Sequence, residues 1–164
     1  MPKIYLITPQ ESAWEGVKKI IAQICNKLGL ELELFQDSEC QSSAANRKLL
    51  LENSAFVIAD ISSRTSNIAK RLEVCYEIGY AQRAQKSILL IAQNNQDLPD
   101  LGQKKILLYT LEEKEKFAKD LIGALMGMCR LEKVRYYRFR HSIEEWKEDV
   151  LPVLPRQDQS LANY

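Results

Sequence analysis

The sequence predicts one α/β domain with a mostly parallel sheet that helices cover on both faces. Three short segments are almost continuously apolar, as the buried strands of a parallel sheet are, and segments with helical periodicity separate them. The chain has 164 residues, which is close to the size of one domain and enough to bury a sizeable core. Alternating strands and helices imply right-handed crossover connections, and therefore parallel strands.

Five segments are predicted to form the strands of this sheet. The three apolar ones are residues 3–8, 55–61 and 87–93. Residues 31–35 alternate charged and apolar side chains, which is typical of a strand near a sheet edge, and residues 104–110 form a fifth candidate. Five strands on this plan commonly take the order 2-1-3-4-5, the flavodoxin-like arrangement of three layers.

Helical periodicity marks four further segments. Residues 14–28 place apolar side chains on one stripe, and Gly29 is predicted to end this helix because glycine commonly follows a helix C-terminus. Residues 41–52 give a weaker helical pattern, whereas residues 71–85 and 111–130 give strong ones. Each of these helices therefore follows a predicted strand, as crossover connections require.

The pattern changes after about residue 130. We expect the α/β domain to occupy residues 1–130, with a short extension over residues 131–155 packed on it and a tail over residues 156–164. Within the extension, Ser142 is placed to cap a short helix that runs to Val150, and two prolines follow it. No internal repeat or linker divides the chain further.

Composition and charge indicate where the protein is located in the cell and which kinds of partner it can bind. The net charge of +1 gives no general attraction to nucleic acid or to an anionic membrane. The chain opens without the basic start and apolar run of a secretory signal, and no apolar stretch approaches the roughly 20 residues that span a bilayer. The cysteines lack the spacing of a zinc site or a disulfide framework. We therefore expect a cytoplasmic protein that is not bound to a membrane. The cysteines are Cys25, Cys40, Cys75 and Cys129.

Several kinds of functional site are excluded by the absence of their motifs. Neither GxGxxG nor GxxxxGK[ST] occurs, so neither glycine-rich phosphate loop is present. His141 is the only histidine, and no compact group of Asp, Glu and Cys replaces a histidine-rich metal site. We therefore expect no bound metal and no cofactor.

Several residues follow the predicted strands at the edge where a ligand site is expected. In open α/β sheets, ligands bind beyond the carboxyl ends of the strands, where the strand order reverses. Small polar side chains there suit hydrogen bonds to a sugar or base. Asp60 is the most informative of them, and it either serves such a site or caps the turn that follows its strand. The residues at these ends are Thr8, Pro9, Gln10, Asp60, Ser62 and Asn94.

Glu77 is the one carboxylate in the apolar segment 74–81. A helix packed on a sheet normally keeps its acids on the solvent face. Glu77 shares a stripe with Glu73 and Tyr80, so it is either a functional group or a solvated glutamate at the border of that face. Gly79 costs the helix about 1 kcal/mol relative to alanine. That cost predicts a close approach by a backbone or ligand, or tight packing on the sheet.

The segment around these two acids resembles a known superfamily. The pattern SAFVIADIS, then Asn67, then YEIGYAQRAQKSILLIA resembles the nucleoside 2-deoxyribosyltransferase-like proteins and the bacterial TIR-like domains related to them. Those proteins show an apolar strand that ends in Asp, a helix with [YW]ELGYA and a second apolar strand. The resemblance covers about residues 3–110, since IYLITP is similar to their first strand. The loop before the helix is longer here, because Asn67 lies ten residues before Glu77.

The resemblance implies a hydrolase or transferase that acts on the N-glycosidic bond of a nucleoside, a nucleotide or NAD. It implies that Glu77 is the nucleophile, or stabilises the cation, at the anomeric carbon. Asp60 would then orient the sugar or transfer a proton, and Thr8, Gln10 and Tyr80 would shape the pocket. The chemistry is consistent, because a desolvated carboxylate stabilises the oxocarbenium charge that develops as the bond breaks.

Two other interpretations stay open. A module of the same fold could bind a nucleotide or a protein partner without turnover, and the chain could form a homo-oligomer. Residues 130–141 interleave basic and aromatic side chains, as single-stranded nucleic-acid sites do, but an edge strand with one wet face has the same pattern. We therefore expect a small nucleoside or nucleotide as the ligand in preference to nucleic acid.

Overall fold

The structure of the chain is a computed structural model, which describes residues 1–8, 14–34, 43–62, 68–94 and 106–134. Pro9 and Gln10 of the predicted site lie outside these stretches. The predicted extension beyond Val134 and the tail over residues 156–164 also lie outside them.

The five described strands form one sheet and confirm the predicted fold class and strand order. The order is β2-β1-β3-β4-β5, and each neighbouring pair is parallel. Each strand lies inside its predicted segment, because continuous apolar runs and the polar residues that flank them define a buried strand closely. The strands are β1 (Lys3–Ile7), β2 (Glu31–Leu34), β3 (Phe56–Asp60), β4 (Ile88–Gln93) and β5 (Ile106–Tyr109).

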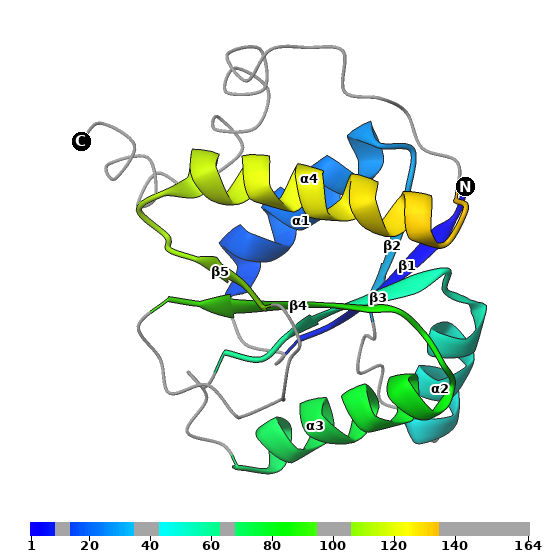
Figure 1. Cartoon of the computed structure of the whole chain (residues 1–164). Helices are drawn as coiled ribbons and strands as arrows, with labels where there is room; N and C mark the ends of the chain where they lie inside the picture. Colours follow the sequence, from blue (N-terminus) through cyan, green and yellow to red (C-terminus); the bar gives the residue numbers. More distant parts are fainter. Residues whose placement is uncertain (9–13, 35–42, 63–67, 95–105, 135–164) are drawn as a thin grey trace.

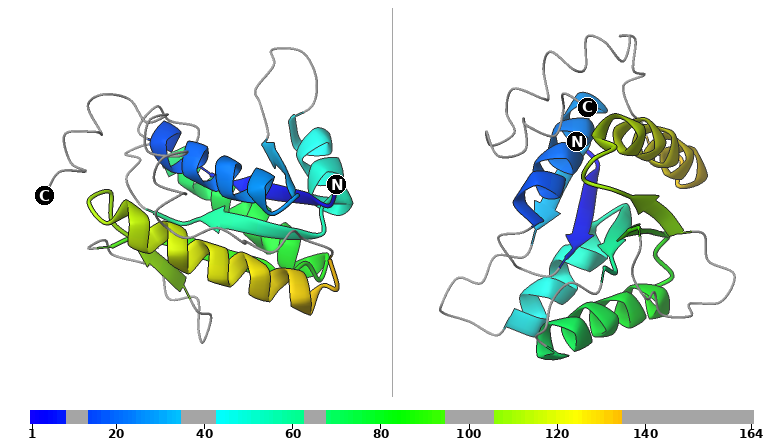
Figure 2. Two further views of the ribbon diagram at one scale, coloured as in Figure 1. Left: turned by 90° about the horizontal axis from the view of Figure 1, so that it is seen from above. Right: turned by 90° about the vertical axis from the view of Figure 1, so that its left-hand side faces the viewer.

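Two layers of helices cover the sheet, one on each face (Figure 1). In Figure 1, α1 and α4 lie on one face of the sheet, and α2 and α3 lie on the other. The right-hand view of Figure 2 shows α2 beside α3 in their layer. The helices are α1 (Glu15–Lys27), α2 (Ser43–Asn53), α3 (Ile68–Arg83) and α4 (Lys114–Leu131).

Gly29 ends α1 as predicted. Its φ angle of 72° lies in the left-handed region that glycine adopts without steric cost. The N–H groups of Gly29 and Leu30 donate to the carbonyl oxygens of Asn26 (2.9 Å) and Cys25 (2.8 Å), which satisfies acceptors of the last helical turn. The chain then turns directly into β2.

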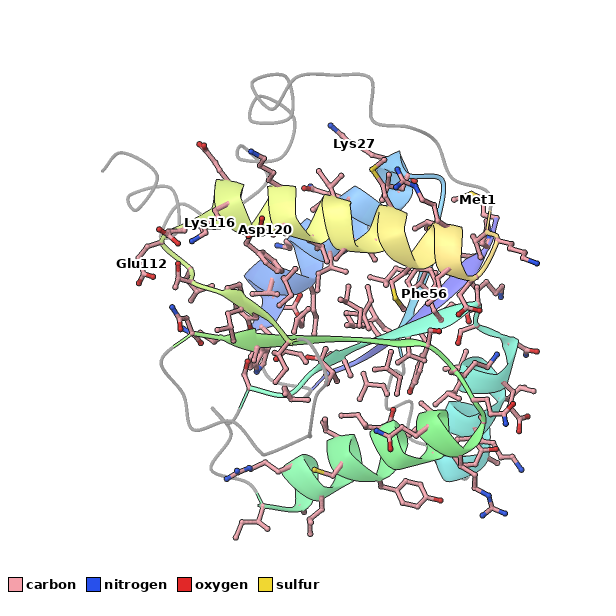
Figure 3. The ribbon with its side chains drawn as sticks, in the orientation of Figure 1. Met1, Lys27, Phe56, Glu112, Lys116 and Asp120 are labelled. Atoms are coloured by element: carbon pink, nitrogen blue, oxygen red, sulfur yellow. The ribbon has the colours of Figure 1, made fainter. Side chains whose placement is uncertain are left out.

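Strand alternation divides the interior into two cores. On β3, Phe56 and Ile58 belong to the core beneath α1 and α4. Val57 and Ala59 belong to the core beneath α2 and α3. Figure 3 labels Phe56 between β3 and the α1–α4 layer. We call these the α1–α4 core and the α2–α3 core, because the side of the sheet that a residue faces decides which groups it can meet.

None of the helices in the described stretches is both long enough and apolar enough to span a membrane.

Candidate functional site

Asp60 lies at the carboxyl end of β3 and is buried. Only 1% of the residue is exposed. Its Oδ1 accepts hydrogen bonds from the backbone N–H (2.9 Å) and the hydroxyl (2.7 Å) of Ser62, and its Oδ2 accepts one from the Tyr109 hydroxyl (2.9 Å). Bonds from a carboxylate to the residue two positions later stabilise a turn. These contacts correspond to the turn-capping interpretation of Asp60.

Ser62 extends this network to the next strand. Its hydroxyl oxygen accepts a hydrogen bond from the backbone N–H of Gln93 at 2.7 Å, and the residue is 3% exposed. The ring of Tyr109 packs against Trp14 and Phe117, with centroid distances of 6.3 and 4.9 Å. Asp60 and Ser62 therefore join the ends of β3, β4 and β5 on the α1–α4 side of the sheet.

Glu77 occupies a different kind of environment, in the third turn of α3. It is 9% exposed, although it carries a carboxylate. Its Oε2 accepts a hydrogen bond from the Tyr5 hydroxyl at 2.8 Å, and its Oε1 pairs with Nη1 of Arg47 at 2.9 Å. The carboxylate is therefore an acceptor held between β1 and α2, and it is not a solvated residue at the border of the helix.

Arg47 connects α2 to α3 through two carboxylates. The same Nη1 atom lies 3.2 Å from Oε2 of Glu73, whose side chain is 56% exposed. Glu77 thus forms the inner contact of the guanidinium and Glu73 forms the outer one. Burial lowers the pKa of Arg47, but the charges of Glu77 and Glu73 raise it further, so the guanidinium remains charged.

The environment of Glu77 shifts the titration of two neighbouring groups. Burial raises the pKa of the Glu77 carboxyl above its ordinary value of 4.5, while the bonds from Tyr5 and Arg47 act in the opposite direction. Burial and the Glu77 charge raise the pKa of Tyr5 above its ordinary value of 10.0. The tyrosine therefore stays a hydrogen-bond donor to the carboxylate at neutral pH.

A pocket of about 640 Å³ opens between α2 and α3 and includes Glu77 in its wall. Its size falls within the range of small-molecule sites. Apolar side chains from both helices alternate in the wall with basic, acidic and tyrosine side chains. The lining residues are Ala45, Arg47, Lys48, Leu51, Ala69, Leu72, Glu73, Tyr76, Glu77 and Tyr80.

The structure does not bring the two predicted catalytic acids together. Asp60 follows Phe56 and Ile58 on the α1–α4 side of β3, and it contacts Tyr109 of that core. Glu77 contacts Tyr5, which belongs to the α2–α3 core. Because side chains of successive strand residues point to opposite faces, the sheet itself separates the two carboxylates.

The other predicted site residues divide between these two places. Tyr80 lines the Glu77 pocket, and its hydroxyl donates to Oε1 of Glu52 at 2.7 Å. Thr8 directly follows β1, and the backbone N–H of Asn94, which directly follows β4, donates to the carbonyl oxygen of Tyr109 at 2.7 Å. Thr8 and Asn94 therefore lie at the carboxyl edge, whereas Tyr80 lies with Glu77.

The sequence did not predict the two residues that hold Glu77, which are Tyr5 and Arg47. Tyr5 is part of a strand that reads as apolar, but its buried hydroxyl needs a partner, and that requirement is a usable signal. Arg47 lies in the weakest predicted helix, and nothing in the local pattern distinguishes it from a solvated arginine. Only the packing of α2 against α3 brings it to Glu77.

The described residues contain no group of three or more His, Cys, Asp and Glu side chains that could hold a metal ion. The group that the pocket offers is a buried carboxylate with a tyrosine and an arginine as partners. Comparison of the chain with protein-family models gave no match, and comparison with curated proteins gave none.

Proposed function

We propose that this protein binds a nucleoside, a nucleotide or NAD in the pocket between α2 and α3 and cleaves or transfers its N-glycosidic bond. The observation that carries the proposal is the position of Glu77. This carboxylate is 9% exposed, lines a pocket of about 640 Å³ and has a donor on each of its oxygens. The resemblance of the YEIGYA segment to the nucleoside 2-deoxyribosyltransferase-like superfamily implies the same role for Glu77.

The surroundings of Glu77 suit a reaction that develops positive charge on a sugar. Cleavage of an N-glycosidic bond passes through an oxocarbenium-like transition state, which a carboxylate removed from water stabilises strongly. Tyr5 and Arg47 fix the direction of the two carboxylate oxygens, and such fixed positions lower the entropy cost of reaching the transition state.

The rest of the pocket wall suits the other parts of a nucleotide. Tyr76 and Tyr80 offer aromatic faces on which a base can stack. Lys48 and Arg47 supply cations for phosphate or sugar oxygens, and Nζ of Lys48 lies 5.8 Å from the centroid of the Tyr80 ring. One wall therefore combines stacking surfaces, cations and the carboxylate.

The proposed reaction proceeds in two displacements. An Oε atom of Glu77 bonds to the anomeric carbon, and the electron pair of the N-glycosidic bond leaves with the base. Water or an acceptor base then attacks the same carbon, and the bond from that carbon to the Glu77 oxygen breaks. The attacking water or base gives its proton to solvent. Asp60 lies across the sheet, so we assign it no proton transfer.

The absence of Asp60 from the pocket favours one class of leaving group. A purine leaves readily only when it is protonated, and a positioned acid normally supplies that proton. A pyridinium base such as nicotinamide leaves as a neutral molecule without gaining one. We therefore expect faster release of nicotinamide from NAD than of adenine from adenosine.

The test is release of free base from a panel of nucleosides, nucleotides and NAD, measured by chromatography. We expect Glu77→Gln to lower the rate by at least about 10²-fold, because it removes the charge that stabilises the transition state. Glu112→Gln is the matched control, because Glu112 is exposed and precedes α4 (Figure 3). Equal rates for wild type and Glu77→Gln would contradict the proposal.

A second candidate function is ligand binding without turnover. It is favoured by one observation: both oxygens of Glu77 already accept a hydrogen bond from the protein, and the charge of Arg47 weakens the carboxylate as a nucleophile. Saturable binding of a nucleotide without release of base from any substrate would support this candidate. In that case Glu77→Gln should change affinity only.

A further inference from the structure

The outward face of α3 is apolar, although it lies at the protein surface. Ile68 is 70% exposed, Leu72 is 63% exposed and Tyr76 is 70% exposed. Cys75 is also exposed. Residues three and four positions apart share one face of a helix, so these side chains form a single stripe, which we call the α3 stripe.

The α3 stripe is not the face that packs on the sheet. Val74, Ile78 and Ala81 are buried on the other side of the helix, in the α2–α3 core. A surface helix normally carries polar side chains opposite its buried face. A helix that is apolar on both sides indicates a second surface to be covered, since contiguous exposed apolar patches mark interaction sites.

Gly79 continues the stripe and supplies an independent observation. It is exposed, and a Cβ atom added there would meet nothing within 4 Å. Packing on the sheet therefore does not require a glycine, although glycine weakens a helix relative to alanine. Close packing of a partner's backbone against α3 would require a glycine at position 79, because glycine has no side chain to hold that backbone away.

We propose that two copies of this chain pack through their α3 stripes in an antiparallel, twofold dimer. Cys75 and Tyr76 lie at the middle of α3, which runs from Ile68 to Arg83. Antiparallel packing about that middle places Leu72 of one copy over Gly79 of the partner subunit. In a twofold dimer the same surface patch of each copy faces the other. The patch must therefore complement itself, as it does when a large side chain of one copy faces a small residue of the other.

The available area also suits a second copy. α3 has 16 residues and the adjacent α2 has 11, which at 1.5 Å per residue makes them about 24 and 16 Å long. Two helices about 10 Å wide then offer about 400 Å² on each copy, or about 800 Å² in all, which is the size of a weak and reversible interface.

The dimer would also change the pocket. Leu72 and Tyr76 belong both to the α3 stripe and to the pocket wall, so the partner subunit would close the outer side of the pocket. This consequence rests on the proposed function, whereas the dimer itself does not.

The test of the dimer is the mass of the purified full chain, measured by light scattering over a range of concentrations without any ligand. We expect the wild-type mass to rise toward that of two chains as the protein concentration increases, and Leu72→Glu to keep a single-chain mass throughout. Leu131→Glu is the matched control, because Leu131 is 67% exposed on α4, in the opposite layer, and it should remain dimeric. Far-UV circular dichroism verifies that each variant is folded. A monomeric wild type, or a dimer that Leu72→Glu leaves intact, overturns the proposal.

A cross-link tests the geometry separately from the mass. In a Cys40→Ser background, Cys75 is exposed while Cys25 and Cys129 are buried. A short bis-maleimide should therefore join two copies through Cys75, and Cys75→Ser should abolish the product. Gly79→Leu should abolish it too, because the added side chain fills the space for the partner helix. Base release is measured in none of these experiments, so they distinguish failure of the dimer from failure of the proposed function.

Discussion

The two faces of the sheet are built in different ways. On one face, α1 buries Val17, Ile21 and Ile24, and α4 buries Leu121 and Leu125, all within one aromatic and aliphatic core. On the other face, α3 buries the Glu77 carboxylate next to the α2–α3 core. The outward side of α3 is apolar as well. Apart from the buried Lys114 and the exposed Leu131 at the two ends of α4, the first layer follows the usual pattern of a surface helix, with apolar side chains toward the core.

The two buried acids of this domain lie in unrelated environments. Asp60 has its oxygens bonded to Ser62 and Tyr109 and lies at a turn. Glu77 has its oxygens bonded to Tyr5 and Arg47 and borders a pocket. We therefore expect substitutions on the α1–α4 side to change stability, and substitutions around Glu77 to change stability and ligand chemistry together.

The largest expected effect is on the α1–α4 side. Leu121 is fully buried at 0% exposure, so Leu121→Ala should lower the free energy of unfolding by about 4 kcal/mol through lost burial and a cavity. Urea denaturation followed by circular dichroism measures the change. The remaining folded protein should release base at the wild-type rate, and a selective loss of that activity would break the division between the two faces.

The next effect concerns the ion pair in the pocket. Arg47→Met leaves the Glu77 carboxylate buried without its cation. We expect this variant to lower the free energy of unfolding by about 3 kcal/mol at neutral pH. The double variant Arg47→Met with Glu77→Gln should recover most of that loss, because no buried charge is left unpaired. Denaturation of all four proteins gives the coupling free energy. Additive effects would show that the pair contributes no interaction of its own.

Two tyrosines provide a matched comparison between the faces. Tyr109→Phe removes a hydrogen-bond donor to Asp60, and Tyr5→Phe removes one to Glu77. Each variant should lower the free energy of unfolding by about 2 kcal/mol, because a buried acceptor loses its partner. Only Tyr5→Phe should also slow base release, since only Tyr5 orients the proposed nucleophile. Rates measured at saturating and at low substrate separate this effect from simple unfolding. Equal rate losses in both variants would contradict separate roles.

The fold could be predicted from the sequence because its signals are local. The apolar runs at residues 55–61 and 87–93 and the polar residues that end them define β3 and β4 without knowledge of any contact. α3 begins at Ile68, three residues before the predicted start, since its apolar outward face obscures the periodicity that marks a helix boundary.

The candidate site could be predicted only in part because it depends on distant contacts. Glu77 stands out as a lone acid in an apolar segment, but its partners Tyr5 and Arg47 lie 72 and 30 residues away in the chain. Asp60 ends its strand as predicted. Side chains alternate along β3, so Asp60 points to the same face as Phe56 and Ile58, which belong to the α1–α4 core. The sequence pattern predicts the end of the strand but not the face of the sheet toward which the Asp60 side chain points.

A smaller effect is expected from pH. The folded pKa of Glu77 is raised, so the folded state binds more protons than the unfolded state above the ordinary value of 4.5. The contribution of Glu77 to stability is therefore fully present below that pH and is lost as the pH rises through the folded pKa. Unfolding curves at a series of pH values should show the decline in wild type and not in Glu77→Gln. An unchanged pH profile in that variant would assign the decline to other groups.

The smallest effects concern two exposed leucines and depend on the partner. Leu131→Ser should change the free energy of unfolding by no more than about 0.5 kcal/mol at any protein concentration, because an exposed side chain loses little burial. Leu72→Ser should be equally mild in solution dilute enough to dissociate the proposed dimer. Its cost should then grow with protein concentration, since dimerisation stabilises the folded state by mass action and this variant lacks the contact. Thermal melts of both variants and wild type over a dilution series measure the difference. Parallel concentration dependence in all three proteins would mean that the apolar face of α3 is covered by no second copy.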